Sequence, residues 1–530
     1  MLSTSRRARA RRGSRGSAVV AAATLVVTVV PAVLLSSPST AAAPKVSSAV
    51  GPSSIWSATS ARPQSVHSGN VRTVNPSSYG AYKLNLRALA DVLKGAPVEG
   101  SRQASARGVR ITVPAPTGEL VSFDVVESPV MEDRLAAAHP EIKTYAGHAV
   151  GFADSIRLDI SPFGFHASVR GDHPSWYVDP AYLNDGSLYL SYFGQSLPEP
   201  ERGLVEPELS DQEISHVKSQ GIGEGPDGLA KQRTYRLALL TDPSYAQFVA
   251  PGLNDGTQDP ASNAAVLAAK TTLMNRVNEV YEDDLGVRMV LINDTDKLNL
   301  NTDAKANQPN GPCGVQRCFE LVATPPTTTA QTPILANGCT SPNLARTRLV
   351  IGQLIGAANF DIGHLGLGIN GGGVASLGVV GGNSKAQGCT GLPTPIGDFY
   401  AIDYVAHEMG HQFAGNHTFN GTQLNCSGGN RNAGTSVEPG SGTSVMAYAG
   451  ICQQDNLQPH SDPYFSERSQ TEIGSYINSA LGNVNEVDSA AFTGFDGTDS
   501  YTLTFGPVTT GTITRGGGYT PAAIKAAIES

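Results

Sequence analysis

The feature that most constrains this chain is the run HEMGHQFAGNH at residues 407–417. On a helix, residues four apart lie on the same face, so His407 and His411 can direct ring nitrogens at one ion. Glu408 cannot share that direction, but it can reach a water held by the ion. If the helix breaks near Gly415, the chain can double back and bring in His417 as a third ligand. Three protein ligands leave a fourth zinc position for water, which is the catalytic arrangement.

A second signal lies downstream, where Ser444-Val445-Met446-Ala447-Tyr448 occurs in a Gly-rich stretch. The two signals together resemble the metzincin metallopeptidases, whose HExxHxxGxxH motif is followed by a methionine turn. The resemblance implies that the three histidines bind one catalytic Zn²⁺ and that Glu408 is the general base. It also implies that Met446 forms an apolar floor beneath the imidazoles. Tyr448 matches a tyrosine of astacins and serralysins, and it could hydrogen-bond an oxyanion or simply pack.

Within this group, residues 232–485 resemble the reprolysin-like branch in the form found in secreted bacterial proteins. The segments that carry the resemblance are 403–413, 416–421 and 438–452. It implies an α+β or α/β fold with a twisted mixed sheet, helices and a zinc cleft. Upstream, Tyr79–Phe193 resembles the β-rich pro-region that such proteins carry.

Two positions depart from the family pattern. Ala414 stands where the family has glycine, so either Gly415 takes over the turn or Ala414 adopts a conformation that does not need glycine. Thr418 follows the third histidine, where the animal reprolysins usually have Asp. Because His417 keeps its offset, we expect it to remain a ligand.

The N-terminus predicts export. Residues 1–43 combine an Arg-rich head, an apolar run over 18–35 and the small residues Ala41-Ala42-Ala43, which is typical of a cleaved signal peptide. The alternative is a retained membrane anchor, because the run is nearly long enough to span a bilayer. The net charge is −9, and losing this Arg-rich segment makes it more negative, which argues against a nucleic-acid partner.

The six cysteines support an exported protein, since an even number in such a chain predicts up to three disulfides. They are Cys313, Cys318, Cys339, Cys389, Cys426 and Cys452. All six fall in the region that carries the histidine motif. The Cys313/Cys318 spacing could be half of a zinc ribbon, but no matching pair follows, so a local disulfide is favoured.

Composition divides the rest of the chain. Residues 44–230 read as a propeptide-like module of strands ending in a Pro-, Glu- and Gly-rich linker at 198–230, a stretch that proteases can cut. The alternative is a constitutive N-terminal domain. Residues 231–490 form the predicted metallopeptidase domain. Residues 491–530 are a short segment that either begins a further module or is an appendage.

Patterns inside these parts predict individual elements. In the first module they predict a helix over 79–93 and a hairpin over 111–126. In the second, strand 235–239, a helix starting at Asp259-Pro260 and strand 287–292 form a βαβ unit, which predicts a partly parallel sheet.

The motif helix is expected over 399–413 and a closing helix over 466–481. The Gly-rich segment Gly371–Gly382 could be an edge strand along which an extended peptide lies. His364 could be a second metal group, but a surface histidine is the commoner case.

These observations predict a secreted, extracellular zinc endopeptidase that acts on proteins or peptides and is not inserted in a membrane once its signal is removed. Two alternatives stay open. One is a secreted binding or adhesion protein with a structural or vestigial zinc site, and the other is a zinc amidase acting on cell-wall peptides. The sequence does not indicate the cleavage preference or the oligomeric state.

Overall fold

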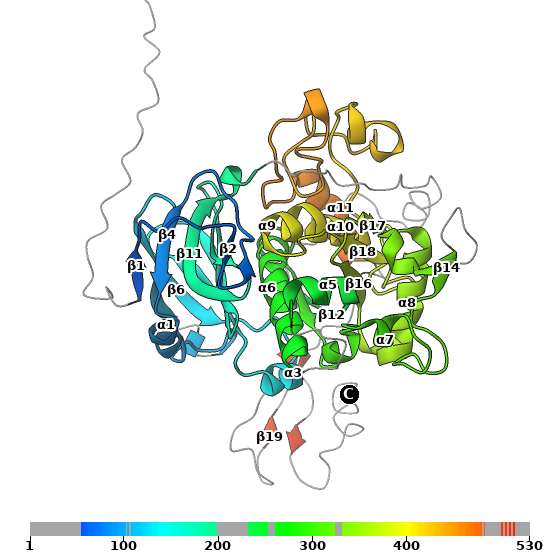
Figure 1. Ribbon diagram of the computed structural model, residues 1–530, viewed down its shortest axis with the longest axis horizontal. Helices are drawn as coiled ribbons and strands as arrows, with labels where there is room; N and C mark the ends of the chain where they lie inside the picture. The colour runs from blue at the N-terminus through cyan, green and yellow to red at the C-terminus, as the bar shows by residue number, and fades with distance from the viewer. Residues whose placement is uncertain are drawn as a thin grey trace, which may run out of the picture. The chain divides into compact units, whose positions relative to one another are not determined.

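The computed structural model describes residues 55–198 and 232–482, apart from 102, 105–107, 253–259, 324–330 and 480–481, and short strands between 500 and 514 (Figure 1). The predicted signal peptide, nearly all of the predicted linker and most of 491–530 lie outside the described residues. Among the described residues, no helix is both long enough and apolar enough to cross a bilayer.

Residues 55–198, called the β-rich module below, form one antiparallel sheet of nine strands in the order β1-β4-β11-β10-β9-β8-β7-β6-β5 (Figure 1). The strands are β1 (Trp56–Ala58), β4 (Gly80–Leu84), β5 (Val109–Pro114), β6 (Leu120–Glu127), β7 (Lys143–Ala149), β8 (Ser155–Ser161), β9 (Gly164–Arg170), β10 (Trp176–Tyr182) and β11 (Asp185–Phe193). A separate hairpin joins β2 (Val66–His67) to β3 (Asn70–Val71), and the helices are α1 (Leu86–Leu93) and α3 (Asp133–Ala138).

This sheet curls until its two ends meet. The indole N–H of Trp56 in β1 donates to the carbonyl of Thr112 in β5 at 2.9 Å, and the hydroxyl of Ser191 in β11 donates to the carbonyl of Pro114 at 2.7 Å. An apolar cluster fills the space that the sheet encloses. Its large members include Trp56, Phe123, Phe165 and Tyr189.

The predicted hairpin over 111–126 is confirmed as β5 and β6, which pair antiparallel. The predicted helix over 79–93 is wrong in its first half, because Gly80–Leu84 is strand β4. The side chain of Asn85 accepts a hydrogen bond from the backbone N–H of Ala88 and caps α1, so the helix begins only there.

The second part, residues 232–482, contains a five-stranded sheet in the order β13-β12-β16-β18-β17. The first four strands are parallel and β17 pairs antiparallel to β18 at the edge. Helix α6 connects β12 to its parallel neighbour β13, so the predicted βαβ unit and the mixed sheet are confirmed. The strands are β12 (Arg233–Thr241), β13 (Val287–Leu291), β16 (Ile362–Leu367), β17 (Gly372–Ala375) and β18 (Gly388–Gly391).

Helices pack around this sheet (Figure 1). They are α5 (Pro243–Val249), α6 (Pro260–Leu285), α7 (Asp303–Ala306), α8 (Ser341–Ile355), α9 (Gly397–Phe399), the π-helical turn η5 (Tyr400–Ala406), α10 (His407–Gln412) and α11 (Glu467–Ile477). A small hairpin joins β14 (Leu321–Ala323) to β15 (Gln331–Pro333). The segments α9, η5 and α10 follow one another without a break and are called the motif helix. The predicted boundaries of the motif helix and of closing helix α11 are met to within a few residues.

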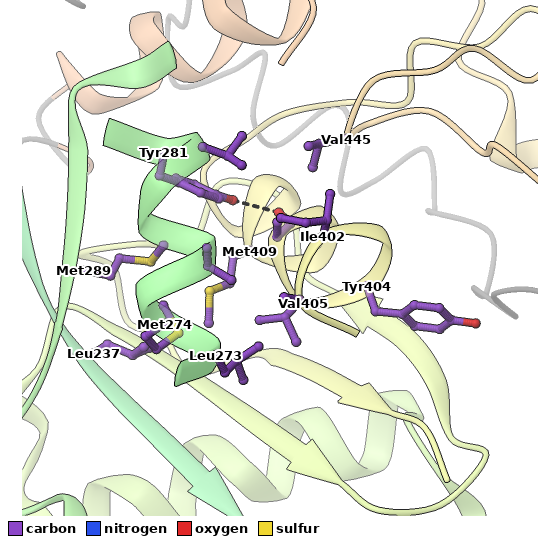
Figure 2. Close-up of a cluster of buried hydrophobic side chains, with 14 of the residues drawn as sticks. Leu237, Leu273, Met274, Tyr281, Met289, Ile402, Tyr404, Val405, Met409 and Val445 are labelled. Carbon is purple, nitrogen blue, oxygen red and sulfur yellow. Dashed lines mark hydrogen bonds between the residues drawn. The ribbon is translucent and has the colours of Figure 1, made fainter. Parts of the chain in front are cut away.

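The motif helix packs on α6 through a buried apolar cluster (Figure 2). Val405 and Met409 lie in this cluster with Met274 from α6, and the hydroxyl of Tyr281 donates to the carbonyl of Ala406 at 2.8 Å. This carbonyl directly precedes His407. The hydrogen bond therefore fixes the position of the helix turn that carries His407 and His411 relative to α6.

Three disulfides brace the second part, and they pair all six cysteines: Cys313–Cys318, Cys339–Cys389 and Cys426–Cys452. The local Cys313–Cys318 bridge confirms the expectation for that pair. Cys389 lies in β18, next to the edge strand. The Cys426–Cys452 bridge joins the chain after the third histidine to the chain after the methionine turn.

Candidate metal centre

The structure brings the three predicted histidines together at the end of the motif helix. His407 and His411 stand one turn apart on α10, and His417 comes back to them after the turn that ends the helix. Their Nε2 atoms lie 3.1 Å apart for His407–His411, 3.1 Å for His411–His417 and 3.2 Å for His407–His417. All three side chains are buried, and together they form a group that could hold a metal ion.

The hydrogen bonds on the far side of each ring set its tautomer. The Nδ1 atoms of His407, His411 and His417 each lie 2.7 Å from a backbone carbonyl oxygen, those of Val445, Gly415 and Asn430 respectively. A carbonyl only accepts, so each Nδ1 carries the proton and each Nε2 turns a lone pair toward the other two.

Three lone pairs at this separation repel one another unless a cation lies between them. Tetrahedral zinc with bonds of about 2.0–2.1 Å to nitrogen places its ligand atoms about 3.3 Å apart, close to the observed separations. Backbone carbonyls behind the rings are the outer contacts that orient histidine ligands in metal sites. The residues present therefore fit a divalent metal ion held by three imidazoles.

The turn that brings His417 back differs from both alternatives predicted for it. Gly415 does not take over the left-handed conformation, because Ala414 itself adopts it at φ 72°. The backbone N–H of Gly415 donates to the carbonyl of Gly410, and that of Ala414 to the carbonyl of His411, both at 2.8 Å. These two bonds form a Schellman helix end. Ala414 thus keeps the family turn at a conformational cost of about 1–2 kcal/mol that glycine would not incur.

Met446 lies under the histidine helix, against Gly410. A Cβ atom at position 410 would stand 2.3 Å from the sulfur of Met446, so only glycine allows this approach. The neighbouring carbonyl of Val445 receives the hydrogen bond from His407, which links the turn to the first histidine. The glycine inside the HExGH run therefore has a packing function that the motif alone does not reveal.

Glu408 points toward the edge strand β17. A Cβ at position 373 would lie 1.9 Å from Oε1 of Glu408, so the carboxylate occupies the space that a side chain there would need. This contact explains glycine at position 373 of the edge strand. The prediction of an edge strand in Gly371–Gly382 holds for β17 only. The following residues turn inward, and Gly378 donates its N–H to the carbonyl of His411 at 2.9 Å.

Tyr448 packs directly on the histidine group. Its ring centre lies 4.6 Å from that of His417 and 5.6 Å from that of His407, and it stacks on Phe419 at 4.5 Å. The ring is almost entirely buried. The contacts establish a packing role for Tyr448 beside the rings of His407 and His417.

Glu438 is a residue of this site that reasoning from sequence missed. Its Oε2 accepts hydrogen bonds from the hydroxyls of Thr418 and Ser444, and its Oε1 accepts from the backbone N–H groups of Thr443 and Ser444 at 3.0 and 3.1 Å. Thr418 follows the third histidine and Ser444 opens the methionine turn. Glu438 thus joins these two segments. The unusual Thr418 was the available signal, because a buried hydroxyl there needs a hydrogen-bond acceptor from elsewhere.

His364 is not a surface histidine, and the expectation of exposure is wrong. It is fully buried in β16, where its ring nitrogens lie 2.9 Å from Oε1 of Gln412 and 2.9 Å from Oγ1 of Thr390. Burial lowers the pKa of His364 to about 4, so the ring is neutral. No second group of metal-ligating side chains accompanies it among the described residues. The ring instead ties Gln412, the last residue of the motif helix, to the central sheet.

Comparison with known proteins agrees with this geometry. The model of the reprolysin-like metallopeptidases, family M12B, matches residues 263–471. The matched stretch begins inside α6, ends inside α11 and includes the three histidines, Glu408, Glu438 and the methionine turn. No curated protein matches the chain.

Proposed function

We propose that the chain is a secreted, zinc-dependent endopeptidase, because the model of the reprolysin-like metallopeptidases of family M12B matches residues 263–471 and this stretch contains the group of three histidines. The observation that carries this proposal is the trio of buried imidazoles whose Nε2 atoms face one another at 3.1–3.2 Å. His407, His411 and His417 would hold one zinc ion. Three ligands leave an open position, which is the arrangement of catalytic rather than structural zinc.

A zinc ion bound there would supply Lewis acidity to the scissile carbonyl and to the attacking water. Glu408 is proposed as the general base that takes a proton from this water and passes it to the leaving amine. Its position one residue after His407, against the open edge strand, supports this role. Tyr448 is proposed to donate a hydrogen bond to the developing oxyanion, because its ring lies against His407 and His417.

The proposed substrates are extracellular proteins or peptides bound in extended form along β17. Within the part of the chain that the structure describes, strand β17 pairs with β18 on one side only, so its other side is proposed to accept an added strand. The carboxylate of Glu408 lies directly beside Gly373 of this strand. A peptide laid along this edge would pass the reacting groups.

Export is proposed from the N-terminal 43 residues and agrees with the three disulfides, which form in oxidising compartments. The segment 44–230 is proposed as a pro-region whose linker is cut after secretion. The linker composition supports this, and so does the position of the β-rich module upstream of the peptidase domain.

The test compares Glu408→Ala with the wild type on casein, with and without 1,10-phenanthroline. We expect the variant to keep its metal and to lose roughly 100- to 10,000-fold in hydrolysis, the usual contribution of a general base. Glu467→Ala, at an exposed position of the same domain, is the matched control. Full activity of Glu408→Ala would remove Glu408 from the mechanism. A wild type that binds metal but cleaves neither proteins nor cell-wall peptides would favour a binding protein.

A further inference from the structure

Helix α6 stands between the motif helix and the β-rich module. One side of it carries Tyr281, which holds the carbonyl of Ala406 next to the histidines. Its opposite side packs against strand β8 of the β-rich module, whose residues are buried on both faces from Ile156 onward. An alternating strand such as β8 would normally leave one face to water. Here α6 covers that face.

An ion pair lies at the centre of this contact. Arg276 of α6 bonds Asp179 of β10, and the two side chains are only 4% and 5% exposed. The second oxygen of Asp179 accepts from the hydroxyl of Tyr192 at 2.6 Å, and the guanidinium lies over the ring of Tyr177 at 5.4 Å. Both charges are therefore neutralised by a partner across the contact and are shielded from water.

Further pairs extend along the same helix. Arg170 of β9 donates to Asp284 at 2.8 Å, and Arg157 of β8 lies 2.5 Å from Glu282. The β-rich module supplies the cation in both pairs and α6 supplies the carboxylate. Charge complementarity of this kind fixes one orientation of two surfaces, while the affinity comes mainly from apolar burial.

Apolar burial comes from a segment of the β-rich module that extends the second sheet. Met131 bridges in parallel to Leu291 of β13, the edge opposite β17. The N–H of Leu291 donates to the carbonyl of Val130 at 2.8 Å, and the N–H of Glu132 donates to the carbonyl of Leu291 at 2.9 Å. Met131 and Leu135 belong to the same buried cluster as the motif helix. Removing the β-rich module would open this core and expose a sheet edge.

We propose that α6 and the edge of β13 form a permanent binding surface for the β-rich module, residues 55–198. When the chain between 198 and 232 is cut, the module stays attached as a non-covalent subunit and does not leave as a released propeptide. The attachment lies on the face of α6 away from the histidines and on the sheet edge away from β17. This attachment does not depend on peptidase activity.

The test introduces the recognition sequence of a site-specific protease between residues 205 and 225 of the full chain. The β-rich module has no cysteine, so cutting removes every covalent link between the two parts. We expect both fragments to co-elute in size-exclusion chromatography, and hydrogen exchange at the amides of Glu132 and Leu291 to stay as slow as in the uncut chain. Separate elution together with fast exchange at these amides would overturn the proposal.

Asp179→Ala in the same cut protein should weaken the association roughly 100-fold or more, because it leaves Arg276 buried without its counter-charge. Asp124→Ala is the matched control, since Asp124 pairs with Arg110 inside the β-rich module and both side chains are well exposed. Circular dichroism of the uncut variants checks that each has folded. An Asp179→Ala protein that is folded and associates as tightly as the control would contradict the assigned surface.

Discussion

Two buried polar clusters lie on opposite sides of helix α6, and they balance their electrostatics differently. At the contact with the β-rich module, Arg276 is matched by Asp179, so the chain supplies both signs of charge. At the motif helix, three imidazoles of one kind converge with their lone pairs inward. The first cluster is complete within the protein, whereas the second is complete only with a cation. A buried cluster of side chains that all present lone pairs thus indicates a cation-binding site. A buried cluster that contains both a positive and a negative side chain indicates a contact between two parts of the protein.

The largest predicted effect follows from removing one charge of the buried Arg276–Asp179 pair. Asp179→Ala should cost about 3–5 kcal/mol of the free energy of unfolding, because it leaves Arg276 buried and unpaired. Replacing the whole group with apolar residues, in Asp179→Leu, Arg276→Met and Tyr192→Phe together, should cost much less, because no charge is then stranded. Urea unfolding of the uncut chain measures both. Equal costs for the single and the triple variant would show that the charges are not what stabilises this contact.

The second prediction concerns the cluster that needs a cation. Glu438→Ala should lower zinc affinity about 10- to 100-fold, the usual cost of losing a group that orients metal ligands, because Thr418 and the methionine turn lose their common acceptor. Competition with a chromogenic chelator measures this affinity. Glu438→Gln should recover part of the loss, since its amide oxygen can still accept from Thr443 and Ser444. Unchanged zinc affinity in Glu438→Ala would show that this link does not position the ligands.

The smallest predicted effect is a pH dependence at the interface. Burial raises the pKa of Glu279 to about 8 and outweighs the hydrogen bond from Ser168 and the charges of Arg170 and Arg157, while Asp283 on the same helix adds to the rise. The folded protein therefore binds a proton that the unfolded chain releases at lower pH. This group's stabilising contribution is then present at acid pH and is lost as pH rises toward about 8.

Thermal unfolding between pH 5 and pH 8.5 measures this loss. Glu279→Gln, which cannot ionise, should flatten the curve relative to the wild type. A wild-type curve that rises over the same range, or an unchanged slope in Glu279→Gln, would rule out this assignment.

The group of three histidines could be predicted from the sequence because the residues that form it lie close together in the chain. Two histidines one helical turn apart and a third after a tight turn need only helix geometry, and the βαβ unit follows from alternating and helical patterns. The prediction of a helix over 79–93 was wrong in its first half. The apolar pattern starts at Tyr79, but the helix begins only after its N-cap, Asn85.

The remaining features depend on contacts between residues distant in sequence. Glu438 sits in a Gly- and Ser-rich stretch that reads as a surface loop, and only the folded chain brings it to Thr418, 20 residues earlier. Arg276 and Asp179 are 97 residues apart, and each reads singly as a surface charge. His364 was expected on the surface because nothing near it in sequence indicates that Gln412 and Thr390 will enclose it.

The most direct test of the central claim is the metal content of the purified, folded chain by inductively coupled plasma mass spectrometry. The account predicts about one zinc per wild-type chain, the same in Glu408→Ala, and almost none in His411→Ala with its circular dichroism spectrum preserved. A folded and proteolytically active wild type without stoichiometric metal would contradict it, as would full zinc retention in His411→Ala.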